Sequence, residues 1–240
     1  MAGLAFEATP VTTLPVRDSD LRFPVARVFC LGRNYAWDAT PDAPREKPLY
    51  FMKPASAVIE ATGEIPYPPF TGEFCHEIEL VVALCKGGSN IDPAHALEHV
   101  WGYAAGLDLT RRDLQMAAKA VGQPWEAAKA FDGAAPITAL VSAQRIGHPR
   151  AGAIWLSVNG QERQRSDLAQ QIWPVADVIS QLSAYITLQP GDLIMTGTPT
   201  GVAALQPGDV VNAAIDGIGS LEMRVGPHPS FVIPHKEHPQ

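Results

Sequence analysis

The chain has 240 residues, of which 46% are hydrophobic and 18% charged, so its composition excludes a disordered protein and its length allows one large domain with a sizeable core. Eighteen Lys and Arg residues against 25 Asp and Glu residues give a net charge of −7, and Arg111-Arg112 is the single short basic cluster, so nucleic acid is not an expected partner. Because no apolar run approaches the ~18 residues that cross a bilayer, a membrane is not an expected partner either.

Cysteine usage and the N-terminal segment indicate the cellular compartment. Cys30, Cys75 and Cys85 form neither a CxxC pair nor an even disulfide framework. The opening MAGLAFEATPV lacks the basic segment and apolar segment of a secretory signal. We therefore expect a cytoplasmic protein.

Most predicted elements are short strands separated by turns. Residues 1–25 are polar and interrupted by prolines, which predicts an N-terminal arm. Helices of a few turns are expected at residues 93–100 and 113–121. The segment HEIELVVALC, residues 76–85, is dominated by β-branched and aliphatic residues and ends at a Gly-Gly pair, which is typical of a central strand. The remaining segments with strand character are residues 26–31, 49–52, 57–59, 153–158, 193–196, 210–215 and 220–225, with a further apolar segment at residues 100–108.

This pattern predicts the fold class. Strands outnumber helices, and the two do not alternate regularly, which argues against a Rossmann fold or a TIM barrel. We expect a β-rich mixed α/β fold, a mixed β-roll or sandwich with short peripheral helices. The last residues, 226–240, are rich in proline and predict a flexible or surface-docked tail.

A proline-rich loop follows the first strand of the predicted domain. Residues 38–48, DATPDAPREKP, hold three prolines and five charged residues, so the segment is too interrupted for a stable helix and too polar for the core. Such loops often close over binding sites. We predict that residues 36–47 form a mobile lid.

Glu77-Ile78-Glu79 is the most informative local feature. A strand repeats every two residues, so both carboxylates point to one face while Ile78 points to the other. Two carboxylates on one face of an aliphatic strand repel each other unless a cation neutralises them, which favours a divalent metal site. Asp108 could supply a third ligand, and all-oxygen ligation favours Mg²⁺, Mn²⁺ or Ca²⁺ over Zn²⁺. The alternative is an acidic strand face turned to solvent.

Two further segments carry groups suited to a small anionic substrate. DLTRRDLQ, residues 108–115, combines acids, two guanidinium groups and an amide, and Lys129 follows in WEAAKAFD. Arginine binds carboxylates, and a lysine can stabilise an oxyanion. The alternative is a solvated ion-pair cluster at a helix start. TGTPTG, residues 196–201, offers hydroxyls and amides to an anion, but it lacks the lysine of a phosphate-binding loop, and a plain turn explains it better.

Seven ordered motifs resemble the fumarylacetoacetate hydrolase family: GRNY, FMKP, HEIELVVAL, GYAAGLDLTRRDLQ, KAFD, VNGQERQ and PGDLIMTGTPTGV. Within it, IPYPPFTGEFCHEIELVVAL and WEAAKAFD most resemble the fumarylpyruvate and acylpyruvate hydrolases of aromatic-compound catabolism. The resemblance covers residues 26–225 and implies a catalytic domain there, between the arm at residues 1–25 and the tail at residues 226–240. It also implies a homodimer and a small oxo-acid substrate whose carbon–carbon bond is cleaved.

The resemblance also implies roles for individual residues. The positions that match the family's metal ligands are Glu77, Glu79 and Asp108, which would hold Mg²⁺ or Mn²⁺, with Ca²⁺ as a third candidate. The predicted catalytic and substrate-binding residues are Lys129 as the active-site lysine, Arg112 and Gln115 as the substrate-facing pair, Thr198 beside the substrate carboxylate, and Arg33 and Tyr35 in the entry motif.

The chain departs from the family pattern at the predicted lid. The family's hydrolases carry a histidine and a glutamate that activate water, and Asp38 and Pro41 occupy those positions here. An aspartate is a weak base at neutral pH unless burial raises its pKa, so Asp38 is the remaining candidate base. The expected activity is a metal-dependent acylpyruvate hydrolase. The alternatives are an oxo-acid decarboxylase or tautomerase, and a catalytically silent metal-binding homologue.

Overall fold

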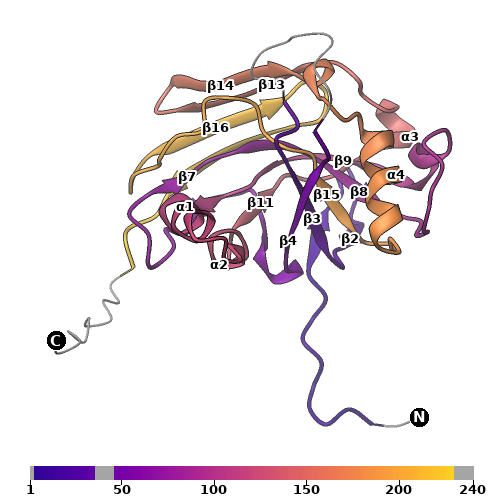
Figure 1. Cartoon of the computed structure of the whole chain (residues 1–240), viewed down its shortest axis with the longest axis horizontal. Coiled ribbons are helices and arrows are strands. Elements are labelled where there is room, and N and C mark those ends of the chain that lie inside the picture. Colours follow the sequence, from indigo (N-terminus) through magenta and orange to yellow (C-terminus); the bar gives the residue numbers. More distant parts are fainter. Residues whose placement is uncertain (1–2, 36–45, 230–240) are drawn as a thin grey trace.

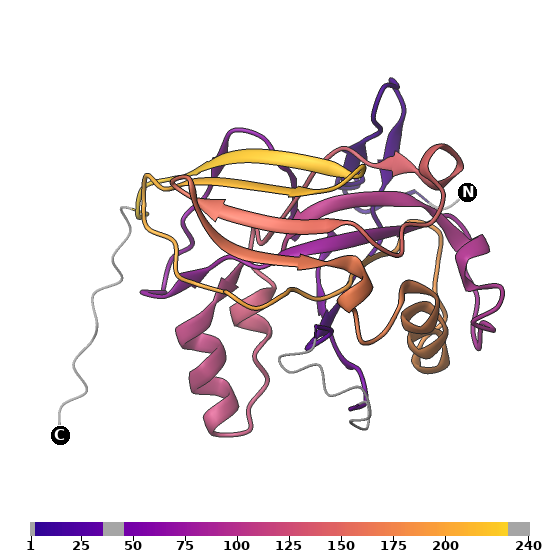
Figure 2. The same ribbon diagram turned by 90° about the horizontal axis from the view of Figure 1, so that it is seen from above.

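The structure is a computed structural model that describes residues 3–35 and 46–229. Two β-sheets lie one above the other, and α-helices lie at the periphery (Figure 1). Figure 2, turned by 90°, places α1 (Arg112–Ala120) at one end of the sheets and α4 (Val175–Tyr185) at the other. The β-rich mixed α/β fold that the sequence predicts is confirmed. Among the described residues, no helix is long and apolar enough to span a membrane.

The larger sheet has eight strands in the order β4-β3-β15-β8-β9-β11-β5, with β12 paired to β9. These strands are β3 (Val28–Gly32), β4 (Leu49–Lys53), β5 (Val58–Glu60), β8 (Ile78–Leu84), β9 (Val100–Leu107), β11 (Ala135–Ile137), β12 (Val141–Ser142) and β15 (Leu193–Met195). The smaller sheet has the order β14-β13-β16-β17-β6. Its strands are β6 (Glu64–Ile65), β13 (Ala153–Val158), β14 (Gln161–Asp167), β16 (Val210–Ile215) and β17 (Gly219–Val225).

Short elements connect and flank the two sheets. The remaining strands are β1 (Thr13–Pro15), β2 (Arg22–Pro24), β7 (Phe74–Cys75) and β10 (Thr110–Arg111). The remaining helices are α2 (Glu126–Lys129), α3 (Ala143–Ile146) and the 3₁₀ helices η1 (Ala55–Ala57), η2 (Ala96–His99) and η3 (Leu168–Gln170). The predicted strand segments thus all contain strands of the structure.

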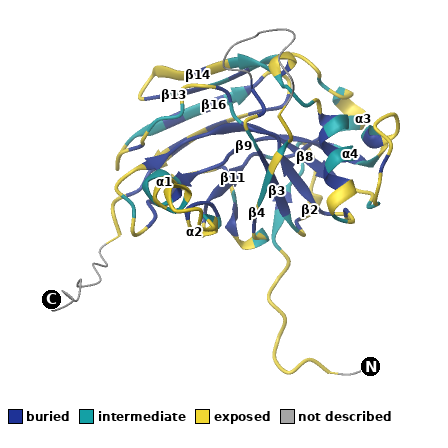
Figure 3. Cartoon of the chain, in the orientation of Figure 1, coloured by how far each residue is buried: buried dark blue, intermediate teal, exposed yellow. Residues whose placement is uncertain are grey.

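Both faces of the larger sheet are buried, which Figure 3 shows as dark blue ribbon along β8 and β9. Ile78, Leu80 and Val82 belong to the core shared with the smaller sheet, whereas Val81 and Ala83 belong to a second core on the other face. That second core joins side chains from β3, β5, β8, β9, β11 and β15, so the sheet curls around it. The period of two predicted for residues 76–85 therefore decides which core each side chain enters.

The helices differ from the prediction in two places. The predicted helix at residues 93–100 is wrong: only η2 forms, because the Asp92 carboxylate accepts from the N–H of Ala94 and holds a turn there, and Val100 already pairs with Leu84 of β8. The sequence analysis missed α4, whose buried residues Val175, Val178, Ile179 and Leu182 have the spacing of one helical face. The predicted helix at residues 113–121 is present as α1.

The N-terminal segment contains a hairpin that the sequence analysis did not predict. Residues 3–11 are exposed and extend away from the body (Figure 1). Strands β1 and β2 pair, and Leu14 and Phe23 are buried in the second core. The predicted lid at residues 36–47 lies outside the described residues except for Glu46 and Lys47, and of the predicted tail only residues 226–229 are described.

Candidate metal centre

Three carboxylates meet where β8 and β9 lie side by side. Glu77 precedes β8, Glu79 lies within it, and Asp108 follows β9. Because these strands are antiparallel and Glu79 pairs with Gly106, the start of one lies against the end of the other. One carboxylate oxygen from each residue lies within 4.8 Å of those from the other two. Glu77 is 8% exposed and Glu79 1%, so the alternative of an acidic face turned to solvent is wrong.

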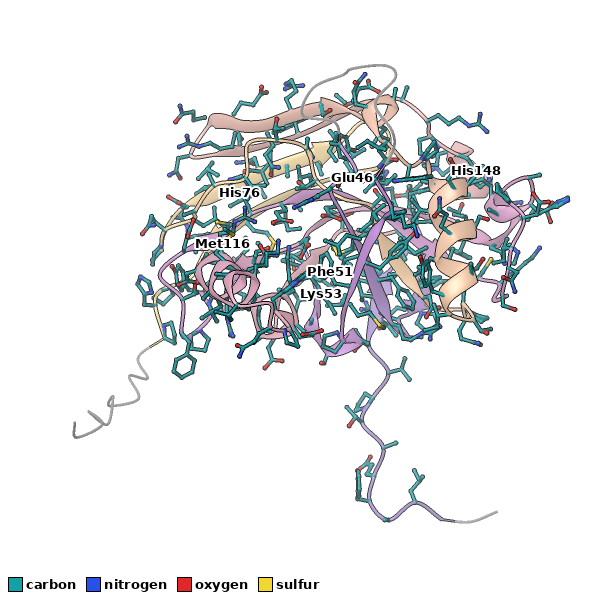
Figure 4. The ribbon with its side chains drawn as sticks, viewed as in Figure 1. Glu46, Phe51, Lys53, His76, Met116 and His148 are labelled. Carbon is teal, nitrogen blue, oxygen red and sulfur yellow. The ribbon has the colours of Figure 1, made fainter. Side chains whose placement is uncertain are left out.

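Two buried lysines contact these carboxylates. Lys129 of α2 places its Nζ 3.0 Å from Glu77 Oε2 and 2.6 Å from Asp108 Oδ2. Lys53, at the end of β4, places its Nζ 2.8 Å from Asp108 Oδ1. Figure 4 labels Lys53 and Phe51, both from β4, the strand that contacts α2. When all three carboxylates are ionised, as metal ligands are, they carry one more charge than the two ammonium groups balance.

The electrostatics of the cluster follow from burial and from the lysines. Burial raises the pKa of Glu77, and it raises the pKa of Glu79 well above its usual value, with Asp108 adding to both effects. Burial also acts to raise the pKa of Asp108, but Lys129 and Lys53 outweigh it and lower that pKa. Burial acts to lower the pKa of Lys129, yet Asp108 and Glu77 raise it. Lys129 therefore remains protonated at neutral pH.

The donor set fits a hard divalent cation. The candidate ligand atoms are carboxylate oxygens, which Mg²⁺ and Mn²⁺ prefer. Asp108 Oδ1 is buried and accepts no well-directed hydrogen bond, although Lys53 Nζ lies nearby. A cation would use this lone pair and balance the excess charge, so the residues fit the metal that the sequence predicts.

A buried amide fixes the peptide between the two glutamates. Gln164 of β14 accepts hydrogen bonds from Ile78 N at 3.2 Å and from the ring of His76, whose Nδ1 lies 2.9 Å away. Its Nε2 donates to Thr198 Oγ1 at 2.9 Å and to the carbonyl of Pro199. Thr198 Oγ1 donates to the carbonyl of Ile78 at 2.7 Å. Side chains thus hydrogen-bond to both the backbone N–H and the backbone C=O of Ile78, the residue between the two glutamates.

The loop at residues 196–201 is therefore more than a plain turn. The backbone N–H of Gly197 donates to Glu79 Oε2 at 2.8 Å, so the loop holds one predicted metal ligand directly. The hydroxyl hydrogen of Thr198 is committed to the carbonyl of Ile78, so this hydroxyl has no hydrogen left to donate to a substrate carboxylate while that bond is kept. Thr110 Oγ1 donates to Glu77 Oε1 at 3.2 Å on the other side of the cluster.

The predicted substrate-facing pair lies on α1. Arg112 Nη1 donates to Gln115 Oε1 at 2.9 Å, and Gln115 is buried. Among the described residues no carboxylate forms an ion pair with Arg112. The alternative of a solvated ion-pair cluster is wrong, because Asp113 instead accepts hydrogen bonds from Thr71 Oγ1 and the N–H of Gly72.

The entry motif is divided between the surface and the interior. Arg33 is exposed and its Nη1 lies 3.5 Å from Glu46 Oε2. Tyr35 is buried, and burial raises the pKa of its hydroxyl. The neighbouring Asn34, which the sequence analysis did not single out, bonds to the backbone of Trp173 and Thr196. The two departures from the family pattern, Asp38 and Pro41, lie outside the described residues.

Comparisons with known proteins identify a family and relatives of this chain. The family model described as fumarylacetoacetate (FAA) hydrolase C-terminal matches residues 27–226. Fumarylpyruvate hydrolase of Ralstonia sp. is 42% identical over 182 residues, which are 76% of this chain and 94% of that protein. Oxaloacetate tautomerase YcgM of Escherichia coli is 38% identical over 208 residues, 85% of this chain and 94% of that protein.

A solved structure is similar over nearly the whole chain. It is the fumarylpyruvate hydrolase of Pseudomonas aeruginosa in complex with Mn²⁺ and pyruvate, with 50% sequence identity and a TM-score of 0.89. The similarity covers 93% of this chain and 99% of that one.

Proposed function

This chain belongs to the fumarylacetoacetate hydrolase family, and on that premise we propose that it is a Mg²⁺- or Mn²⁺-dependent hydrolase that cleaves a carbon–carbon bond in acylpyruvates of the fumarylpyruvate type. The observation that carries the proposal is the buried cluster of Glu77, Glu79 and Asp108 around Lys129. The similar enzyme from Pseudomonas aeruginosa supports it, since that structure holds Mn²⁺ and pyruvate.

The chemistry divides between the metal and the side chains. A divalent ion held by the three carboxylates would supply a Lewis acid for the oxo-acid end of the substrate. Lys129 carries a proton in a buried site, so it stabilises negative charge on an enolate or oxyanion oxygen. Arg112 and Gln115 orient the substrate through their hydrogen-bonded pair. Water attacks the distal carbonyl carbon, the carbon–carbon bond breaks, and the electron pair passes to the pyruvate enolate, which takes up a proton.

One alternative activity is supported by specific observations. Oxaloacetate tautomerases are among the relatives, and a tautomerase or decarboxylase needs an enolate-stabilising lysine but no water-activating dyad. The replacement of that dyad by Asp38 and Pro41 favours this alternative, or a silent metal-binding homologue. We also propose a cytoplasmic homodimer that acts on small oxo-acids, without nucleic-acid or membrane partners, in aromatic-compound catabolism.

One panel of substrates tests the proposal. Chelator-treated protein is loaded with Mn²⁺ or Mg²⁺ and offered fumarylpyruvate, acetylpyruvate and oxaloacetate, with ultraviolet absorbance and product analysis as readouts. We expect fumarate and pyruvate in equal amounts from fumarylpyruvate. Keto–enol exchange of oxaloacetate without cleavage of any acylpyruvate would favour the tautomerase alternative. If no substrate were turned over, the catalytically silent metal-binding homologue would be the remaining alternative.

Variants connect the activity to the cluster. Glu79→Gln should lower Mn²⁺ affinity at least tenfold, measured by titration calorimetry, because a buried ligand charge is lost. Lys129→Met should lower kcat by about two orders of magnitude or more, because charge stabilisation in a buried site is lost. The matched controls Glu222→Gln and Lys86→Met replace exposed residues and should behave as wild type. Wild-type Mn²⁺ affinity in Glu79→Gln would contradict the metal assignment.

A further inference from the structure

Two adjacent aromatic rings with a lysine at each end form a row from the carboxylate cluster to the surface. Lys129 Nζ lies 5.1 Å from the ring centroid of Phe51. The rings of Phe51 and Trp125 are 5.0 Å apart, and Lys119 Nζ lies 5.2 Å from the centroid of Trp125. Lys119 is exposed, whereas Lys129 is buried. The row therefore connects the proposed active-site lysine to a second lysine at the surface.

Lys119 belongs to the same helical face as the predicted substrate-facing pair. Arg112, Gln115 and Lys119 are spaced by three and four residues along α1, which places them on one side of the helix. Trp125 lies just before α2, the helix that carries Lys129. Because Lys119 contacts the Trp125 ring, this face is turned toward α2.

Two cations of this helical face lack an anionic partner in the part of the chain that the structure describes. Among the described residues neither Lys119 nor Arg112 forms an ion pair with a carboxylate. Burial lowers the pKa of Lys119, and repulsion by Arg112 lowers it further. Positive charges without anionic partners attract an anion from solution.

We propose that Lys119, together with Arg112, binds a second carboxylate at the far end of the substrate. The inference rests on the proposed function and specifies its substrate class: acylpyruvates whose acyl group is planar, unsaturated and ends in a carboxylate. The oxo-acid end lies at the carboxylate cluster and the conjugated acyl chain lies along Phe51 and Trp125, whose rings offer flat apolar surfaces. Lys119 is thus a specificity-determining residue for dicarboxylic over monocarboxylic acylpyruvates.

Steady-state kinetics test the inference with Lys119→Met, Lys119→Arg and the exposed control Lys86→Met. Lys119→Met should raise the KM for fumarylpyruvate about tenfold, as the loss of one charged contact worth about 1.4 kcal/mol does, with kcat little changed. The preference for fumarylpyruvate over acetylpyruvate should fall by the same factor. Lys119→Arg should keep most of that preference, and Lys86→Met all of it. An unchanged preference in Lys119→Met would overturn the inference, as would an equal loss on both substrates.

Binding measurements separate this inference from the proposed hydrolysis. Titration calorimetry with Mn²⁺ and pyruvate present compares fumarate with crotonate, in which a methyl group replaces one carboxylate. Fumarate should bind wild type more tightly than crotonate, and Lys119→Met should remove that difference without changing Mn²⁺ affinity. This result would support the inference even if no acylpyruvate were cleaved. Equal binding of fumarate and crotonate to wild type would overturn it.

Discussion

Gln164 uses both hydrogen-bond donors and both acceptor positions of its amide, and every partner lies near a predicted ligand or substrate residue. It reaches from the smaller sheet to Ile78, the residue between the two glutamates. Gln164 therefore fixes the direction of both carboxylates without touching a metal or a substrate itself.

Replacing this amide should weaken metal binding. Gln164→Leu leaves the buried N–H of Ile78 without its acceptor, which costs about 1–3 kcal/mol of stability. Mn²⁺ affinity, measured by titration calorimetry, should fall about tenfold because the carboxylates lose their fixed orientation. Gln161→Leu, on the exposed side of the same strand, is the matched control. Wild-type Mn²⁺ affinity in folded Gln164→Leu would show that Glu77 and Glu79 are oriented by other contacts.

For single residues, the sequence predicts the acidic candidate ligands better than the buried residues that contact and orient them. The ExE spacing indicates that Glu77 and Glu79 share a face, and the family motifs indicate Asp108 and Lys129. Lys53 and Gln164 were missed although both stand in quoted motifs, FMKP and VNGQERQ. A lysine at a strand end and a glutamine in a polar strand look like surface residues, and only the packing of distant strands buries them.

At the scale of elements, the strands were predictable where both faces are apolar. Segments such as β8, β9 and β16 carry unbroken or alternating aliphatic residues, a pattern that is typical of strands. Strand β14 reads QERQRSD and contains little apolar signal, yet it pairs along its whole length with β13. Pairing with β13, which the local composition of β14 does not encode, formed that strand.

The start of α1 depends on one carboxylate, and this gives a pH-dependent prediction. Burial acts to raise the pKa of Asp113, but hydrogen bonds from Thr71, Gly72 and Leu114 lower it below its usual value. The ionised Asp113 carboxylate therefore stabilises the folded protein fully above the ordinary aspartate pKa of about 4. This stabilisation is lost as the pH falls through the lowered pKa that Asp113 has in the folded protein.

Asp113→Asn should reduce the free energy of unfolding by about 1 kcal/mol at pH 7, a figure limited by the partial exposure of the site. The difference from wild type should shrink toward pH 3, measured by urea unfolding at each pH. Asp20→Asn, an exposed residue, is the control. A difference that stayed constant from pH 7 to pH 3 would mean that the charge of Asp113 contributes nothing.

At the scale of the whole molecule, the N-terminal hairpin completes the second core. Residues 3–11 are exposed, whereas Leu14 and Phe23 are buried in the curled sheet's core. Deleting residues 3–11 should leave the melting temperature within about 2 °C of wild type. Deleting residues 3–24 removes two large buried side chains, each worth about 2–5 kcal/mol, and should lower it by 5 °C or more. Equal melting temperatures in the two deletions would show that the hairpin does not support the core.

The pairing of β3 with β15 has a consequence for the order in which the molecule can be made. These strands lie side by side and parallel, with Val28 opposite Leu193, although most of the chain separates them. During synthesis β3 can pair early with β4 on one edge, but its other edge leaves the ribosome long before β15 exists, so that edge stays unpaired or pairs wrongly. Because such distant contacts form slowly, folding of this protein should be largely post-translational. The yield of native protein should rise when a chaperone covers the unpaired edge of β3.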